Sequence, residues 1–153
     1  MARQPIQVIV IAFRKRTNAD YEFAAFHRID NSMWHFISGG AEDDETPEQA
    51  AYREAEEEAG IPAAVPFFRL DSRASVPKTA FTPTEHWPDD IFVVPEYAFA
   101  VDAIDQEFTL SHEHDEVKWL TFTEAHKLLT WDSNKTALWE LRERLRSCRL
   151  TPV

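Results

Sequence analysis

An acidic segment with glycines at both ends constrains the fold of this chain more than any other feature. All three glycines of the 153-residue sequence flank it, namely Gly39, Gly40 and Gly60. Thr46 and Gln49 match the capping-box pattern of a helix start, and Pro47 suits the first helical position. Gly60 can adopt the left-handed conformation that ends a helix. The sequence therefore predicts a helix over residues 47–59, with conformational freedom at both of its ends.

Three glutamates lie on one face of the predicted helix. Glu54, Glu57 and Glu58 are spaced i, i+3 and i+4, so their carboxylates project close together. Like charges at this spacing destabilise a helix by about 0.2–0.5 kcal/mol per pair, and the negative end of the helix dipole adds to the repulsion. Mg²⁺ or Mn²⁺ would offset it, because such ions take oxygen ligands and are commonly shared with substrate phosphates. The spacing therefore predicts a divalent-metal site, with a solvated acidic face as the alternative.

Neighbouring residues distinguish this segment from an ordinary run of surface charge. Arg53 can pair with Glu57 or reach Glu45, and so orient the acids. The opposite face carries small apolar residues that suit packing on a sheet, namely Ala50, Ala51, Ala55 and Ala59. We therefore favour the metal site over the solvated face.

Short apolar runs on both sides of the helix predict β-strands. They are rich in β-branched and aromatic residues and are bounded by turn residues. They cover residues 7–13, 21–29, 34–37, 66–76, 91–101 and 116–122. Pro95, within one of these runs, suits an edge or a bulge. Residues 17–20 have the composition of a turn, and residues 77–90 that of a loop.

Two helical elements follow the last predicted strand. Thr123 can cap a helical turn that runs to Leu129, and Asp132 or Ser133 can cap a longer amphipathic helix. Strands, a central helix, more strands and a terminal helix pair describe an α/β fold with a mixed β-sheet. The length predicts a single domain over residues 1–153.

Charge and cysteine content narrow the classes of partner. The formal net charge of −11 gives a surface that repels nucleic-acid backbones and anionic lipid. We therefore expect neither a nucleic-acid polymer nor a membrane as partner. The charge does not exclude a small phosphorylated substrate, because divalent cations can reverse the local sign of an acidic pocket. Cys148 is the only cysteine, and residues 1–5 do not form the apolar core of a signal peptide. A reducing cytoplasm is the expected compartment.

The stretch GGAEDDETPEQAAYREAEEEAGI, residues 39–61, resembles the Nudix box, the signature of the Nudix hydrolase family. The resemblance implies an α/β/α sandwich that hydrolyses a diphosphate linkage with Mg²⁺ or Mn²⁺. It implies that Glu57 and Glu58 are metal ligands and that Glu54 is a ligand or an acid/base partner.

The same resemblance implies roles for residues around these acids. Arg53 and Glu45 would orient them, and the carbonyl of Ser38 would be a further metal ligand, while Gly39 and Gly60 are structural residues of the box. Two positions depart from the family pattern. Ala55 replaces a larger aliphatic residue, and Asp44 stands where glycine is frequent, which makes the loop geometry before Glu45 harder to predict.

Two further segments are similar to Nudix sequences. The residues Leu110-Ser111-His112-Glu113-His114, with Val117-Lys118-Trp119-Leu120 after them, resemble the Glu-His and Trp-Leu pattern near the end of the Nudix sheet. An acid in that loop binds a second metal or acts as base in the family, which implies this role for Glu113; a surface acid is the alternative. The segment 131–135 is similar to the subgroup that includes dihydroneopterin triphosphate pyrophosphatase and dATP pyrophosphohydrolase. For Trp131, Ser133 and Asn134 the alternative is core packing and capping.

The predicted substrate is dihydroneopterin triphosphate or a dNTP, with release of pyrophosphate or phosphate. Candidate phosphate-binding cations are Arg14, Lys15, Arg28, Lys78 and Lys135, and candidate ring-stacking residues are Trp34 and Trp87. Most of the cations have an equally simple role as surface charges, and both tryptophans as core residues. Alternative substrates are nucleotide sugars, dinucleoside polyphosphates and oxidised nucleotides, and the alternative function is non-catalytic nucleotide sensing. The sequence leaves a monomer and a homodimer equally open.

Overall fold

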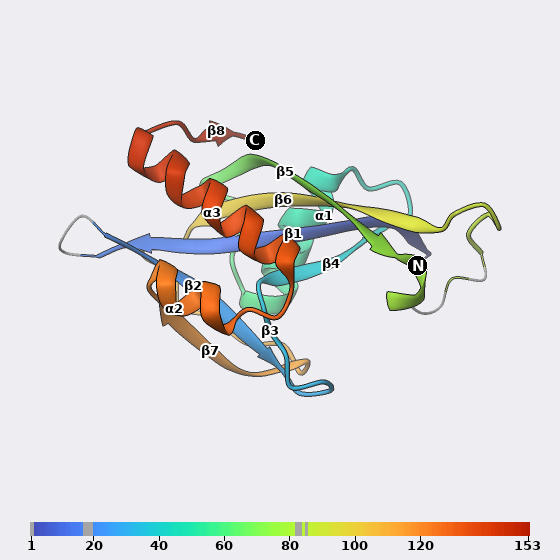
Figure 1. Ribbon diagram of the computed structural model, residues 1–153, viewed down its shortest axis with the longest axis horizontal. Helices are drawn as coiled ribbons and strands as arrows, with labels where there is room; N and C mark the ends of the chain where they lie inside the picture. Colours follow the sequence, from blue (N-terminus) through green and yellow to red (C-terminus); the bar gives the residue numbers. More distant parts are fainter. Residues whose placement is uncertain (1, 17–19, 82–83, 85) are drawn as a thin grey trace.

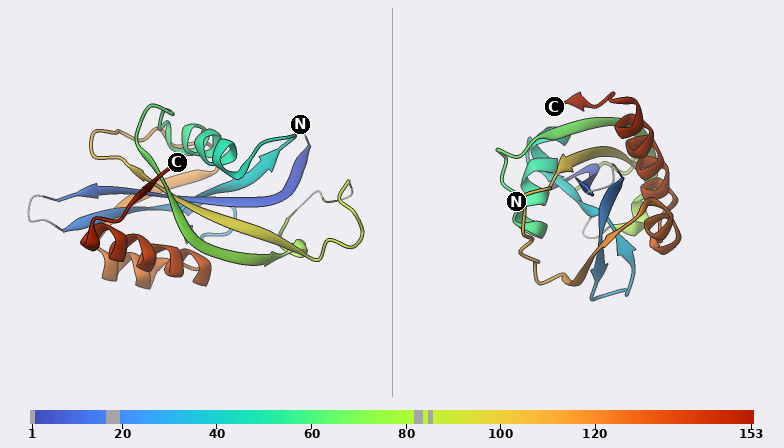
Figure 2. Two further views of the ribbon diagram at one scale, coloured as in Figure 1. Left: turned by 90° about the horizontal axis from the view of Figure 1, so that it is seen from above. Right: turned by 90° about the vertical axis from the view of Figure 1, so that its left-hand side faces the viewer.

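A mixed β-sheet forms the centre of the structure, and helices cover both of its faces (Figures 1 and 2). The structure is a computed structural model that describes residues 2–16, 20–81, 84 and 86–153. Its elements are β1 (Arg3–Lys15), β2 (Tyr21–Arg28), β3 (Trp34–His35), β4 (Ile37–Glu42), α1 (Pro47–Ala59), β5 (Phe67–Pro77), the 3₁₀ turn η1 (Lys78–Ala80), β6 (Val93–Asp102), β7 (His114–Leu120), α2 (Phe122–Leu128), α3 (Asp132–Ser147) and β8 (Thr151–Pro152).

The sheet has the strand order β3-β2-β1-β6-β5-β8, with β4 also paired to β1 and β7 to β2. The β1–β6 pair is parallel, and the other described pairs are antiparallel. Seen edge-on in Figure 2, the sheet has α1 on one side and α2 and α3 on the other. The predicted α/β/α sandwich with a mixed sheet is therefore confirmed.

The alternation of side chains along β1 divides the core into two layers. Val8, Val10 and Ala12 pack with the alanines of α1, whereas Ile9, Ile11 and Phe13 pack with α2 and α3. Successive residues of a strand point to opposite faces, so a continuous apolar run here serves a strand buried on both sides. Among the described helices, none is long and apolar enough to cross a membrane.

Helix α1 begins and ends where its local signals predict. The Thr46 side chain accepts a hydrogen bond from the Gln49 amide, and the Gln49 side chain accepts one from the Thr46 amide. Gly60 closes the helix in the left-handed conformation with φ 71°. The alanine face of α1 is fully buried against the sheet. Local capping and tertiary packing therefore fix the same helix boundaries.

The structure corrects the predicted role of the first two glycines. The predicted strand 34–37 is divided between β3 and the start of β4, and Gly39 and Gly40 lie within β4, where they pair with Val8 and Gln7 of β1. The left-handed residue before α1 is Asp43, with φ 50°. The two glycines are needed because side chains from elsewhere occupy the space where a Cβ would stand. These two glycines thus provide space for neighbouring side chains and not conformational freedom at the helix start.

Other predicted boundaries were wrong by a few residues. Thr121 caps α2 through a capping box with Glu124, so the Thr123 cap is incorrect. Helix α3 starts after Trp131 without a side-chain cap, so neither Asp132 nor Ser133 serves as predicted. Part of the predicted turn 17–20 and of the predicted loop 77–90 lies outside the described residues.

Pro95 does not lie in an edge strand, because β6 pairs with both β1 and β5. It pairs with Ser75 of β5, while the register of β6 with β1 starts one residue later, at Glu96. Pro95 thus precedes the paired part of β6 and β1 and interrupts no pairing between them.

The capping box gives a prediction for stability. Thr46→Ala removes the oxygen that accepts the Gln49 amide, and we expect it to lower the free energy of unfolding by about 1 kcal/mol. Urea denaturation measures this change. Thr123→Ala is the matched control, because Thr123 is exposed in α2 and caps nothing; equal losses in the two variants would contradict the capping role of Thr46.

Candidate active site

A cavity of about 840 Å³ lies over the edge of β4 and contains the predicted acids. Glu54, Glu57 and Glu58 reach it from α1, and Glu113 reaches it from the loop before β7. Ser38, Gly39 and Gly40 of β4 form part of its wall. The structure therefore brings the acids of two distant segments into one cavity, as the metal-site hypothesis requires.

Arg53 is the centre of the hydrogen-bond network beside these acids. Its Nε and Nη2 donate to the two carboxylate oxygens of Glu45 at 2.8 and 3.0 Å. Its Nη1 donates to Glu54 at 3.0 Å and to Glu57 at 3.1 Å, and its Nη2 also reaches the carbonyl of Gly40 at 2.8 Å. This guanidinium lowers the pKa of Glu45. Arg53 therefore ties the loop, β4 and the acidic face of α1 together.

Glu58 is a buried acid with one oxygen left unpaired. Its side chain is only 3% exposed. Its Oε1 accepts the amide of Ser38 at 3.0 Å, whereas the buried Oε2 has no hydrogen-bond partner among the described residues. The nearest base is His114, whose Nε2 lies 3.9 Å from Oε2. A buried carboxylate oxygen without a donor is costly, so this atom points to an absent positive ligand.

Two buried histidines lie behind Glu58. The Nε2 atoms of His35 and His114 are 2.9 Å apart, so one ring donates its N–H to the other. Burial, and then the neighbouring His114, lower the pKa of His35 to about 3, so His35 is neutral at pH 7. Burial likewise lowers the pKa of His114. The pair supplies no permanent positive charge to Glu58.

Burial also shifts the two inner acids of α1. It raises the pKa of Glu54 to about 7, although Arg53 acts in the opposite direction. It raises the pKa of Glu58 to about 8, with the Ser38 amide opposing and the nearby Glu54 and Glu113 adding to the shift. Each carboxylate is therefore held where its negative charge is under-compensated by the protein itself.

The donor set fits a hard divalent cation. The unpaired oxygen of Glu58 and the raised pKa of Glu54 and Glu58 are the features that a bound cation would relieve. In the conformation described, no three His, Cys, Asp or Glu side chains of the described residues already stand in a metal-binding arrangement. Arg53 contacts one oxygen of Glu54 and one oxygen of Glu57, so the other oxygen of each carboxylate is left for an ion.

Comparison with known sequences places this site in a family. A sequence model of the NUDIX domain matches residues 4–139. The chain belongs to the NUDIX family. Membership supports pyrophosphohydrolase activity on a nucleotide-like substrate, and Glu45, Glu54, Glu57 and Glu58 lie in the segment that resembles the Nudix box.

Three relatives illustrate how far the Nudix likeness extends. A protein of Listeria monocytogenes described as a NUDIX hydrolase is 43% identical, with a TM-score of 0.88 over 98% of this chain and 100% of that one. The Escherichia coli dihydroneopterin triphosphate pyrophosphohydrolase shares the fold at 21% identity, with a TM-score of 0.76 over 94% and 99% of the two chains. An RNA pyrophosphohydrolase of Pseudomonas aeruginosa is 53% identical over 36 residues, which is 24% of this chain and 23% of that relative.

Several residues predicted to bind substrate do not line the cavity that contains the acids of α1. Arg14 pairs with Glu22 and lies over Trp119. Trp34 packs against His27 and Lys118. The cavity wall contains neither of these two residues, nor Lys15, Lys78 or Lys135. Trp87 is also outside it and is buried, with its Nε1 donating to the Arg3 carbonyl. None of them is part of the proposal below.

Arg28 does line the cavity, but its guanidinium is already paired with Asp30. Its Nε and Nη2 donate to the two oxygens of Asp30, each at 2.9 Å. The hydrogen bond to Asp30 raises the pKa of Arg28. A phosphate would therefore compete with Asp30 for this guanidinium.

Sequence reasoning gave no role to Arg3, Gln7 and Glu96, which also line the cavity. Gln7 and Glu96 are polar residues inside otherwise apolar strands, which was the available signal. The buried Nε of Arg3 has no partner among the described residues, although its Nη2 donates to Gln7 at 2.6 Å. Arg3 is therefore a cation at the cavity wall with capacity for a further acceptor.

Proposed function

We propose that this Nudix protein is a metal-dependent hydrolase that cleaves a diphosphate linkage in a nucleoside triphosphate-like substrate. Dihydroneopterin triphosphate and a dNTP are the leading substrates, with pyrophosphate or phosphate released. The observation that carries the proposal is the unpaired, buried oxygen of Glu58 at the wall of a cavity that Glu54, Glu57 and Glu113 also line. A bound cation would supply the positive partner that this oxygen lacks.

The residues proposed to hold Mg²⁺ or Mn²⁺ are Glu54, Glu57 and Glu58 with the Ser38 carbonyl, and Glu113 for a second ion. When bound, the ion neutralises phosphate charge and makes a water a better nucleophile. Arg53 is proposed to position Glu54 and Glu57 through the two hydrogen bonds that it donates from Nη1.

Glu113 is proposed as the general base that takes the proton of the attacking water. It is exposed and lines the same cavity as Glu54 and Glu58, which supports this role. Glu54 is the alternative base, since burial already brings its pKa to about 7.

The test is hydrolysis of a panel of phosphorylated compounds by purified protein with Mg²⁺, Mn²⁺ or EDTA. The panel contains dihydroneopterin triphosphate, the four dNTPs, a nucleotide sugar, a dinucleoside polyphosphate, an oxidised dNTP and a 5′-triphosphorylated RNA. We expect metal-dependent release of pyrophosphate or phosphate from the first two classes and little from RNA, because the net charge of −11 repels a polymer. Binding without product under any metal would favour the sensing function.

Metal binding gives a prediction that does not depend on turnover. At a metal concentration about 100 times its Kd, a native-state ligand adds about 2.7 kcal/mol, so MnCl₂ or MgCl₂ is expected to raise Tm by about 5–10 °C. EDTA should reverse the rise, and Glu58→Gln should abolish it. Differential scanning fluorimetry measures both effects, and an equal rise in Glu58→Gln would remove Glu58 from the ligand set.

A further inference from the structure

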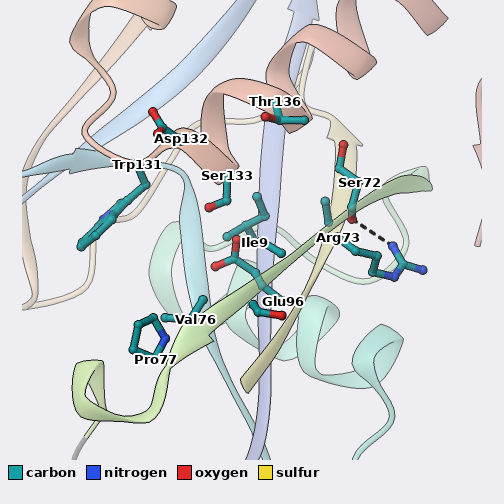
Figure 3. Close-up of a pocket in the computed structure, with 13 residues that line it drawn as sticks. Ile9, Ser72, Arg73, Val76, Pro77, Glu96, Trp131, Asp132, Ser133 and Thr136 are labelled. Atoms are coloured by element: carbon teal, nitrogen blue, oxygen red, sulfur yellow. Dashed lines mark hydrogen bonds between the residues drawn. The ribbon is translucent and has the colours of Figure 1, made fainter. Parts of the chain in front are cut away.

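A second cavity of about 440 Å³ adjoins the first, between β5, β6 and the start of α3 (Figure 3). The two cavities share five wall residues, namely Ile9, Val76, Glu96, Trp131 and Ser133. A molecule held at the acids of α1 can therefore extend into the second cavity without leaving the protein surface.

The sheet register gives the distance between the two ends. Gln7 of β1 pairs with Gly40 of β4 on one side and with Glu96 of β6 on the other. Neighbouring strands lie about 4.8 Å apart, so Glu96 stands about 10 Å from the β4 edge. A planar ring joined through a sugar or side chain to a row of phosphates spans such a distance. The phosphate end and the ring end of one substrate therefore fit the two cavities.

Glu96 is the unusual residue in the second cavity. It is 7% exposed, and no lysine, arginine or histidine of the described residues forms an ion pair with it. Burial raises its pKa, and a hydrogen bond from Ser133 is the opposing influence. Figure 3 shows its carboxyl group directed toward Ser133 and the open space. Its remaining acceptor capacity faces the cavity rather than the protein.

The other walls suit a flat ring. Trp131 is 49% exposed at the mouth of the cavity, and Ile9, Val76 and Pro77 provide apolar surface. An exposed indole offers a stacking face to any planar base. The cavity thus combines one stacking surface with one buried acid.

We propose that this second cavity holds the ring of the substrate and that Glu96 selects a 2-amino-4-oxopyrimidine edge, as found in guanine and in pterins. The inference rests on the proposed function, since the phosphates at α1 fix which end of the substrate enters. A carboxylate has two acceptor oxygens and complements two adjacent N–H donors. Guanine and pterin present an amino group beside a ring N–H. Adenine and cytosine present a donor beside an acceptor, and thymine has one N–H between two carbonyls.

Glu96→Gln tests the selection, because the amide carries one donor and one acceptor and so matches adenine instead. We expect the ratio of kcat/KM for dGTP to that for dATP to fall at least about 10-fold, and the ratio for dihydroneopterin triphosphate to dATP to fall likewise. A larger loss with one of the two favoured substrates identifies whether guanine or pterin is the natural ring. An unchanged ratio in a folded Glu96→Gln variant would overturn the proposal.

Calorimetric titration separates this inference from the proposed function. The ligands are dGMP, dAMP and dihydroneopterin monophosphate in MgCl₂, none of which can lose pyrophosphate. A preference for dGMP or the pterin that shifts toward dAMP in Glu96→Gln supports the ring site even if no triphosphate is hydrolysed. Hydrolysis with a ratio that Glu96→Gln does not alter keeps the function and rejects the ring site.

Two further variants guard against a purely structural role for Glu96. Trp131→Ala at the exposed rim should weaken binding of all the monophosphates about 10-fold without changing their order, because stacking tolerates every base. Unchanged binding in Trp131→Ala would place the ring elsewhere. Glu116→Gln, an exposed acid on β7 outside both cavities, is the matched control and should alter neither quantity.

Discussion

Glu57→Gln is expected to lower kcat by about 1,000-fold or more while the protein stays folded. Loss of one metal ligand removes several kcal/mol of transition-state stabilisation, and each 1.4 kcal/mol is a factor of about ten in rate. The side chain of Glu57 is 58% exposed and makes its one described contact with Arg53, so the fold does not depend on it. Steady-state hydrolysis of the best panel substrate, with circular dichroism and Tm, measures both parts of the expectation.

The neighbouring acid provides the control for this result. Glu56 precedes Glu57 on the same helix and is exposed, but it does not line the cavity. Glu56→Gln changes the net charge and the helix propensity in the same way and should retain nearly full activity. Comparable losses in the two variants would attribute the effect to charge or helix stability, and near-normal activity of Glu57→Gln would remove Glu57 from the metal site.

Gly39→Ala is expected to reduce kcat/KM by about 100-fold with only a small fall in Tm. The added Cβ would occupy the space of the Glu54 carboxylate, and because this is the end of a flexible side chain, Glu54 can move away. The helix and the sheet stay in place, but the acid leaves the position in which Arg53 holds it at 3.0 Å. Kinetics and thermal denaturation of the single variant measure the two effects separately.

A double-mutant cycle tests whether Gly39 acts through Glu54. In the Glu54→Gln background the acid is already lost, so adding Gly39→Ala should cost little more. Full additivity of the two losses would contradict this coupling. It would mean instead that Gly39 serves the strand geometry of β4 or the approach of substrate.

The part of the site on α1 could be predicted because its determinants are local. The capping box of Thr46, the left-handed Gly60 and the spacing of the acids all lie within one short segment. Arg53 also reaches its partners within that segment, from Gly40 to Glu57. Propensity and spacing are sufficient for such contacts, so the helix boundaries and the predicted pairing of Arg53 with Glu45 and Glu57 agree with the structure.

The second cavity could not be predicted because the proximity of its residues depends on strand register. Glu96 lies beside Gln7 only through the parallel β1–β6 pair. Ser133 comes from α3, which is distant from both residues in the sequence. The charges of Arg14 and Lys135 looked equally suitable in the sequence, but β1 carries Arg14 to the end of the sheet where it meets Glu22. Sequence spacing contains no information on which end of a long strand borders the cavity.

Confinement of the Arg53 network to one continuous stretch has an evolutionary consequence. The proposed metal ligands of α1 are held by Arg53 within this stretch, whereas the walls of the proposed ring cavity come from β1, β5, β6 and the start of α3. Mutations in those walls can therefore change substrate preference without altering the proposed metal ligands. A related enzyme with a new substrate would then need to differ only in the residues that contact the ring.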